Sequence, residues 1–314
     1  MIDFRFHMIS LVAVFLALGL GVLIGTAVLN EELVDRIKNN VQTLQEDKRA
    51  LQEDVLDLDR QLDADARFAD VAEQWLTQDT LTGRRVILLD FAGTDDRVED
   101  NVRTSIETAG GEIAAEITFT EKFALPGVVE RDQLALALGS TSDVPAELRS
   151  ESGDVVGSRL ASAALGQGRE GRADAADAAA RDLLDTLAEA GFVDLDRDSL
   201  GRFVPDRGLF VIAGGSVDRR PFNVPALGLP LAVAIADRGA PVVVAESSDS
   251  AWGLVAGIRT DAAEDRLTTV DDVESISGRI ATVLGLVQSL DGMTDHYGTG
   301  PGAEEVIPRP TPEE

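Results

Sequence analysis

The hydrophobic pattern of this chain begins with residues 9–29, an apolar run without a single charged side chain. At about 1.5 Å per helical residue, the run reaches about 32 Å, enough to cross the hydrocarbon core of a bilayer. It is longer than the apolar core of a signal peptide, and no small-x-small cleavage site follows it. We therefore predict an uncleaved transmembrane helix over residues 9–29.

A heptad pattern over residues 30–66 follows, in a stretch that holds neither Pro nor Gly between Gly25 and Gly83. Valine at position a and leucine at position d favour a parallel two-stranded coiled coil, and Lys48 at an interior a position can fix its register. The narrow apolar stripe favours this coil over one amphipathic helix lying on its own domain. The predicted seam consists of Val34, Ile37, Val41, Leu44, Lys48, Leu51, Val55, Leu58 and Leu62.

Two further features concern the partner of this helix. Gly21 and Gly25 form a G-x-x-x-G spacing, which lets two membrane helices approach closely. The positions that flank the seam offer no attractive pair in a parallel homodimer, where Asp54 would face Asp59 of the second copy. A parallel homodimer and a coil with another protein's helix therefore both stay open.

The pattern changes after a connecting helix over residues 67–82, which Gly83 ends. Short apolar runs then alternate with amphipathic segments, which predicts a mostly parallel sheet covered by helices over residues 83–300. The Pro- and Glu-rich residues 301–314 predict a disordered tail. The strands are expected at 84–91, 112–120, 209–213, 241–245, 254–259 and 267–270, and the helices at 95–108, 155–165, 173–190, 226–238 and 277–290.

Topology follows from the lengths of these segments. A tail of eight residues, then an apolar helix and a large domain, is typical of a single-pass anchor with its N-terminus inside. We predict that residues 1–8 are cytoplasmic and that the α/β domain lies outside the cytoplasmic membrane.

Composition narrows the function. The formal net charge of −28, from 56 acidic and 28 basic side chains, argues against binding of nucleic acid, which needs a cationic surface. The chain has no cysteine, which excludes disulfides and cysteine-ligated metal centres.

The sequence contains few candidates for catalytic or ligand-binding residues. Gly214 and Gly215 follow a strand at the edge where doubly wound sheets bind ligands, but no phosphate-binding fingerprint accompanies them, so we predict a structural turn. No nucleophile motif is present, and we predict no catalytic or cofactor-binding residue. Met293 and His296 could meet on one helical turn as copper ligands, but a solvated loop is the favoured interpretation.

Several stretches resemble known sequences. The opening residues 1–26 (MIDFRFHMISLVAVFLALGLGVLIGT) are similar to the start of the actinobacterial MctB family, and TTVDDVES, GRIATVLGL and HYGTG are similar to its C-terminal part. The resemblance implies a role in copper homeostasis, with copper as a possible ligand and an outer envelope membrane as an alternative location. Its SteB branch implies a SteA-like partner and control of cell-wall hydrolysis.

The residues predict a non-enzymatic, membrane-anchored envelope protein that binds a partner, and the resemblance to the SteB branch implies that this partner acts in the control of cell-wall remodelling. One apolar span encloses no pore, and the strand segments lack the alternating pattern of an outer-membrane barrel. Copper transport or copper homeostasis is the alternative that the family resemblance implies.

Overall fold

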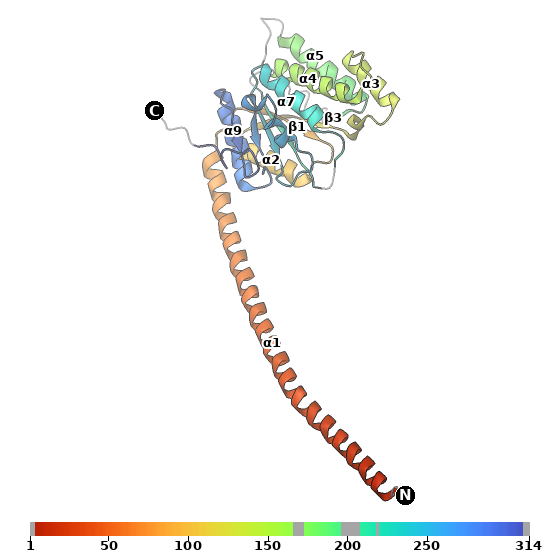
Figure 1. Ribbon diagram of the computed structural model, residues 1–314. Coiled ribbons are helices and arrows are strands. Elements are labelled where there is room, and N and C mark those ends of the chain that lie inside the picture. The colour runs from red at the N-terminus through yellow and green to blue at the C-terminus, as the bar shows by residue number, and fades with distance from the viewer. Residues whose placement is uncertain (1–3, 166–172, 196–207, 218–219, 310–314) are drawn as a thin grey trace. The chain divides into compact units, whose positions relative to one another are not determined.

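The computed structural model describes residues 4–165, 173–195, 208–217 and 220–309. The chain divides into two compact units, Met1–Ala66 and Arg67–Glu314. Helix α1 (Phe4–Thr77), with 74 residues, forms the first unit and contributes its last turns to the second (Figure 1).

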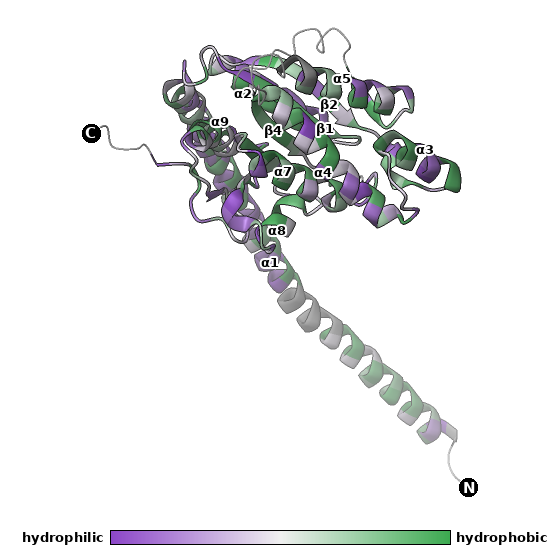
Figure 2. Cartoon of the chain, turned by 90° about the horizontal axis from the view of Figure 1, so that it is seen from above, coloured by the Kyte–Doolittle hydropathy of each residue, from purple (hydrophilic) through white to green (hydrophobic). Residues whose placement is uncertain are grey.

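The N-terminal part of α1 is long and apolar enough to cross a membrane. Its apolar span covers Arg5–Gly25, with a mean hydropathy of 2.6, and its ribbon is coloured as hydrophobic in Figure 2. This span starts four residues before the predicted one, and the helix already includes residues 4–8 of the predicted tail. No atom lies within 4 Å of a Cβ built on Gly21 or Gly25, so that face of the helix is open.

The predicted seam lies on the surface of α1. Its apolar side chains are exposed by between 44% at Val34 and 66% at Leu44, and Lys48 is exposed as well. Helical geometry is therefore present over residues 30–66, while the pairing of this seam with a second helix stays a prediction.

The second unit is built on one mixed, mostly parallel sheet. Within the described residues its strand order is β3-β2-β1-β4-β5-β6-β7, and only the β2–β3 pair is antiparallel. The strands are β1 (Arg85–Phe91), β2 (Glu112–Phe119), β3 (Val193–Leu195), β4 (Leu209–Gly214), β5 (Val242–Glu246), β6 (Thr268–Val270) and β7 (His296–Tyr297).

Helices cover both faces of the sheet, as the apolar strands predict. Ile87 and Leu89 of β1 pack into one core cluster, whereas Val86 and Leu88 pack into the other. The first face carries α3 (Val128–Leu138), α4 (Pro145–Ala164), α5 (Ala173–Glu189), α7 (Pro225–Asp237) and the short α8 (Leu254–Ile258). The second face carries α2 (Asp96–Thr108) and α9 (Ile276–Leu290). The α/β prediction is confirmed.

Two glycines let α4 and α7 pack closely. A Cβ on Gly153 would lie 2.8 Å from the backbone nitrogen of Leu231, and a Cβ on Gly157 would lie 2.6 Å from the carbonyl oxygen of the same residue. Real Cβ atoms do not approach backbone atoms so closely, so any side chain here would force the two helices apart.

Three predictions about elements were wrong or incomplete. Most of the predicted strand at 254–259 is helix α8, because the carboxylate of Glu246 accepts hydrogen bonds from the backbone N–H groups of Gly253 and Val255 at the start of that helix. The sequence pattern missed α3, the first half of α4, β3 and β7. In the predicted disordered tail, Glu305 bridges to Tyr297, so residues 301–309 pack on the domain, and residues 310–314 lie outside the described residues.

Candidate functional site

Aromatic side chains pack together at the ends of β1 and β4, where this kind of sheet can form a ligand crevice. The strand order reverses direction between β1 and β4, and doubly wound sheets bind ligands outside the carboxyl ends of the strands at such a point. Here the ring centroids of Phe91 and Trp252 lie 6.0 Å apart in an edge-to-face contact. A Cβ on Gly214 would lie 2.6 Å from Trp252 Cζ3, so Gly214 makes room for the indole ring.

The adjoining turn also has a structural explanation. Gly215 has a φ of 130°, which favours glycine, and its carbonyl oxygen accepts a hydrogen bond of 3.1 Å from the backbone N–H of Asp95. The turn after β4 is thereby bonded to the residue that caps α2. These contacts give Gly215 a structural role in the turn.

A buried ion pair fixes the C-terminal segment on the same edge of the sheet. Arg259 forms an ion pair with Asp271 and donates to the carbonyl oxygen of Tyr297 at 2.7 Å and to that of Pro301 at 3.1 Å. Asp271 accepts the backbone N–H of Thr299 at 2.8 Å and that of Gly300 at 3.0 Å. The TTVDDVES and HYGTG stretches therefore meet here as a structural lock.

The cavity beside this lock is small. Its volume is about 120 Å³, and Glu246, Arg259 and Asp271 are among its lining residues. Small-molecule pockets usually measure about 300 to 1,000 Å³. Since all three charged groups already have partners, the lock is better suited to hold the chain than to bind a substrate.

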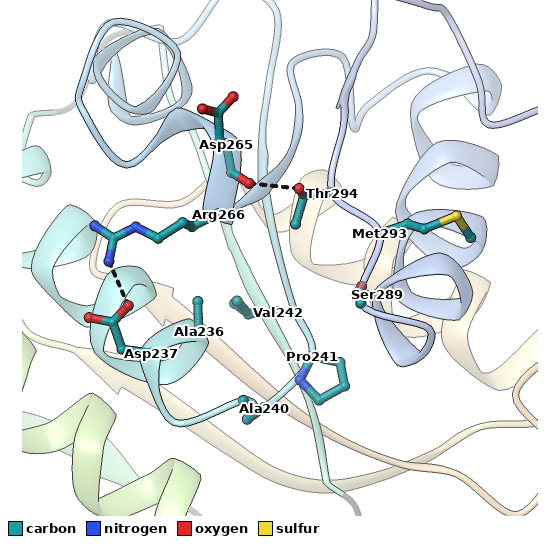
Figure 3. Close-up of a pocket in the computed structure, with 12 residues that line it drawn as sticks. Ala236, Asp237, Ala240, Pro241, Val242, Asp265, Arg266, Ser289, Met293 and Thr294 are labelled. Carbon is teal, nitrogen blue, oxygen red and sulfur yellow. Dashed lines mark hydrogen bonds and ion pairs between the residues drawn. The ribbon is translucent and has the colours of Figure 1, made fainter.

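The two weak candidates for copper ligands do not share a helical turn. Helix α9 ends at Leu290, so Met293 lies in the following loop, whereas His296 begins β7. Met293 is 41% exposed at the rim of a cavity of about 280 Å³, and Figure 3 shows its side chain directed away from the other labelled lining residues.

The imidazole of His296 has a partner of its own. Its Nδ1 lies 2.9 Å from Thr269 Oγ1, and burial together with nearby Arg259 lowers the pKa of the ring. Among the described residues, no group of three or more His, Cys, Asp or Glu side chains is placed to hold a metal ion. The idea of a Met293–His296 pair on one helical turn is therefore wrong.

The last turns of α1 are fixed to the domain by a fork-shaped ion pair. Arg279 of α9 donates to the two carboxylate oxygens of Glu73, from Nε at 3.0 Å and from Nη2 at 2.7 Å. The hydroxyl of Ser105 on α2 donates to the same carboxylate at 2.9 Å. The side chains of Glu73 and Arg279 are only 13% and 16% exposed, so water screens the pair weakly.

Polar groups surround this junction. A groove of about 360 Å³ beside it is lined only by polar and charged residues, among them Gln74, Asn101 and Thr104. The sequence pattern did not single out Glu73 or Arg279. Arg279 does lie within the GRIATVLGL stretch, but one sequence carries no signal that pairs residues 206 positions apart.

The same turns of α1 also carry an exposed apolar stripe. Phe68, Val71 and Trp75 are exposed by 74%, 56% and 83%, and their spacing of three and four residues places them on one face of the helix. Exposed aromatic side chains at such spacing are typical of helices that bind other proteins.

A second group of charged side chains surrounds Arg103 of α2. Arg103 donates to Glu116 at 2.8 Å, to Glu99 at 2.7 Å and to Asp100 at 3.1 Å. Asp90 of β1 is only 3% exposed, and its Oδ1 has no hydrogen-bond partner among the described residues. Burial, with a smaller contribution from Glu99 and Glu116, raises the pKa of Asp90 to about 7.

Comparison with known proteins gives one consistent answer. The family described as "Copper transport outer membrane protein, MctB" matches residues 1–308. The "Copper transporter MctB" of Mycobacterium tuberculosis H37Rv is 30% identical over 320 residues, which cover 98% of this chain and 99% of the relative. The protein of that name from Mycobacterium leprae is 27% identical over 322 residues, with the same coverage. The chain therefore belongs to the MctB family, and the resemblance of its two ends and its signature stretches is confirmed.

Proposed function

We propose that this MctB-family chain is a non-enzymatic envelope protein that presents a helical contact surface from a membrane anchor, and that it takes part in the control of cell-wall remodelling. The observation that carries the proposal is the Glu73–Arg279 junction. A fork of two charge-assisted hydrogen bonds is strong and geometrically specific, so it supports a firm connection between the last turns of α1 and the domain.

The anchor is expected to cross the cytoplasmic membrane once, with the N-terminus inside. The apolar span of 21 residues supports this topology by its length and composition. Protease added to spheroplasts should then remove the α/β domain. If that domain stays protected until detergent dissolves the membrane, the orientation is wrong.

The contact surface is the seam from Val34 to Leu62. Its apolar side chains are exposed along one face of α1, and exposed apolar surface of this extent usually marks a binding site. The partner helix would lie parallel to α1, either from a second copy or from a membrane-associated, SteA-like protein. No nucleic acid is expected as a partner, because the chain is strongly acidic.

Copper handling is the second candidate, and the names of the relatives favour it. Copper(I) prefers thiolate and thioether ligands, and copper(II) favours imidazole. Cysteine is absent from the sequence, and Met293 and His296 lie on different elements of the domain. We therefore expect any effect on copper tolerance to follow indirectly from the state of the envelope.

A deletion strain complemented with variants separates the two functions. The seam variant carries Leu44→Asp and Leu51→Asp, which place charges in the d layer. Its matched control carries Thr43→Asp and Ala50→Asp, which add the same charges at exposed positions outside the seam. The ligand variant carries Met293→Leu and His296→Gln. All chains should reach wild-type levels in an immunoblot.

The proposal requires the seam variant to lose cell-wall integrity, while its control and the ligand variant behave as wild type. The opposite result, in which only the ligand variant fails and the purified chain binds copper, would replace the proposal by the copper function. If Leu51→Asp leaves crosslinking between chains unchanged, residues 30–66 do not form a coiled coil and that part of the proposal is wrong.

A further inference from the structure

Asp90 has an unusual position for a carboxylic acid. It lies near the carboxyl end of a central strand, 3% exposed, with one oxygen that makes no hydrogen bond among the described residues. The carboxyl has a side-chain hydrogen bond with Thr118, the residue opposite it on β2. Burying a carboxylate with so few partners is costly, so such groups usually bind a proton or occur where their ionisation has a use. Asp90 has no role in the function proposed above.

The charges that face Asp90 come from two neighbouring elements. Strand β2 places Thr118 opposite Asp90, and Glu116 lies two residues before Thr118 on the same side of the strand. Arg103 of α2 donates to Glu116 at 2.8 Å, and Glu99 of α2 adds a further negative charge. The strand on the other side, β4, reads LFVIAG and carries no charged residue. We call Asp90, Glu99, Asp100, Arg103 and Glu116 the Arg103 cluster. With Asp90 protonated the cluster carries three carboxylates and one guanidinium, and ionisation of Asp90 adds a fourth negative charge beside them.

The helix that carries this arginine also holds α1. Ser105, two residues after Arg103, donates its hydroxyl to Glu73. The position of α2 therefore affects both the Arg103 cluster on its inner side and the junction with the last turns of α1. A shift of α2 caused by repulsion within the cluster would lengthen the Ser105–Glu73 hydrogen bond.

We propose that the Arg103 cluster is a proton-linked latch, in which a protonated Asp90 lets α2 hold the end of α1 firmly and an ionised Asp90 loosens that hold. The two contacts of α2, through Arg103 and through Ser105, are the physical connection. The pKa of Asp90, raised to about 7 by burial, places the transition near neutral pH. The latch lies within the α/β domain, so it does not depend on the identity of any partner.

Hydrogen exchange of the full chain in detergent tests the latch. Protection of the amides of residues 67–77 is compared at pH 5.5 and pH 8.5, after correction for the intrinsic exchange rates. We expect protection to fall roughly tenfold as the pH rises, which is what a tenfold difference in the proton affinity of Asp90 between the two states produces. Asp90→Asn should abolish this dependence.

Two variants separate the latch from a general effect of pH. Asp96→Asn makes the same chemical change at an exposed position of α2 and should keep the wild-type response. Ser105→Ala removes the link to Glu73, so residues 67–77 should lose their pH dependence while the amides of α2 keep theirs.

Two results would overturn the inference. One is a wild-type chain whose residues 67–77 are equally protected at both pH values. The other is an Asp90→Asn chain that responds to pH as the wild type does, since the response would then come from another group.

Discussion

Arg279 and Glu73 are 206 positions apart in the sequence, yet their side chains form the fork that fixes the last turns of α1 to α9. Both groups are largely shielded from water, and the hydroxyl of Ser105 completes the shell of the carboxylate. The ion pair therefore fixes the last turns of α1 to the domain.

Replacing Glu73 by Ala should destabilise the domain by about 3 kcal/mol, because Arg279 is left as an uncompensated, largely buried charge. Denaturant unfolding of the full chain in detergent measures this. Arg60→Ala is the control, since the Arg60–Asp57 pair is exposed and should contribute at most about 0.5 kcal/mol. The double variant Glu73→Ala, Arg279→Ala should lose less than the sum of the single variants. Simple additivity would mean that the pair does not act as a unit.

Much of the fold could be predicted from the sequence, because its strands and helices carry strong local signals. Continuous runs of Val, Ile and Leu in β1, β4 and β5 mark strands that are buried on both faces. Residues 254–259 misled the pattern, since their apolar side chains suit either state. The carboxylate of Glu246 caps the start of the helix, and this contact cannot be recognised from the hydrophobic pattern of residues 254–259 alone.

The sites were harder to predict than the elements, for a physical reason. Arg259 and Asp271 lie on different elements and meet only after the sheet has formed, and so do Arg103 and Glu116. Heptad spacing is a local property and predicts the seam, whereas ion pairs between distant segments leave no pattern in one sequence. The packing of Trp252 against Gly214 was missed for the same reason.

The Arg259–Asp271 lock should be essential for stability. Arg259→Met keeps the volume but leaves Asp271 buried without its cation, which should cost about 3–5 kcal/mol. Residues 297–309 should also become sensitive to protease, because this segment loses two hydrogen bonds from the guanidinium, at Tyr297 and at Pro301. Arg266→Met is the control, since the Arg266–Asp237 pair is about half exposed. Equal effects of the two variants would show that burial of the pair does not matter.

The close contact of α4 with α7 predicts that adding one methyl group between them lowers the stability of the domain. Gly153→Ala should destabilise the domain by about 1–3 kcal/mol, because the new Cβ meets the backbone of α7. Gly257→Ala in α8 is the matched control. Nothing lies within 4 Å of its Cβ, so the better helix propensity should make it neutral or stabilising by up to about 1 kcal/mol. Thermal unfolding compares the two, and a stable Gly153→Ala variant would contradict the predicted steric conflict.

The buried carboxyl of Asp90 predicts how stability depends on pH. The pKa of Asp90 is raised from 3.8 to about 7 in the folded chain, so the folded state binds the proton more tightly than the unfolded state. Stability from the neutral carboxyl is fully present below about pH 4 and is lost as the pH rises to about 7. The Asp90→Asn variant has no ionisable group at this position, so it keeps this contribution to stability over the same pH range.

At pH 8 the Asp90→Asn variant should therefore unfold at a higher temperature than the wild type. Its free energy of unfolding should be larger by an amount on the order of 1 to 4 kcal/mol. The difference should shrink steadily toward pH 4, where both side chains are neutral. Calorimetry at a series of pH values gives the curve, with Asp96→Asn as the exposed control. A difference that is constant between pH 4 and pH 8 would mean that Asp90 does not titrate in the folded chain, and its burial would then need another source of compensation.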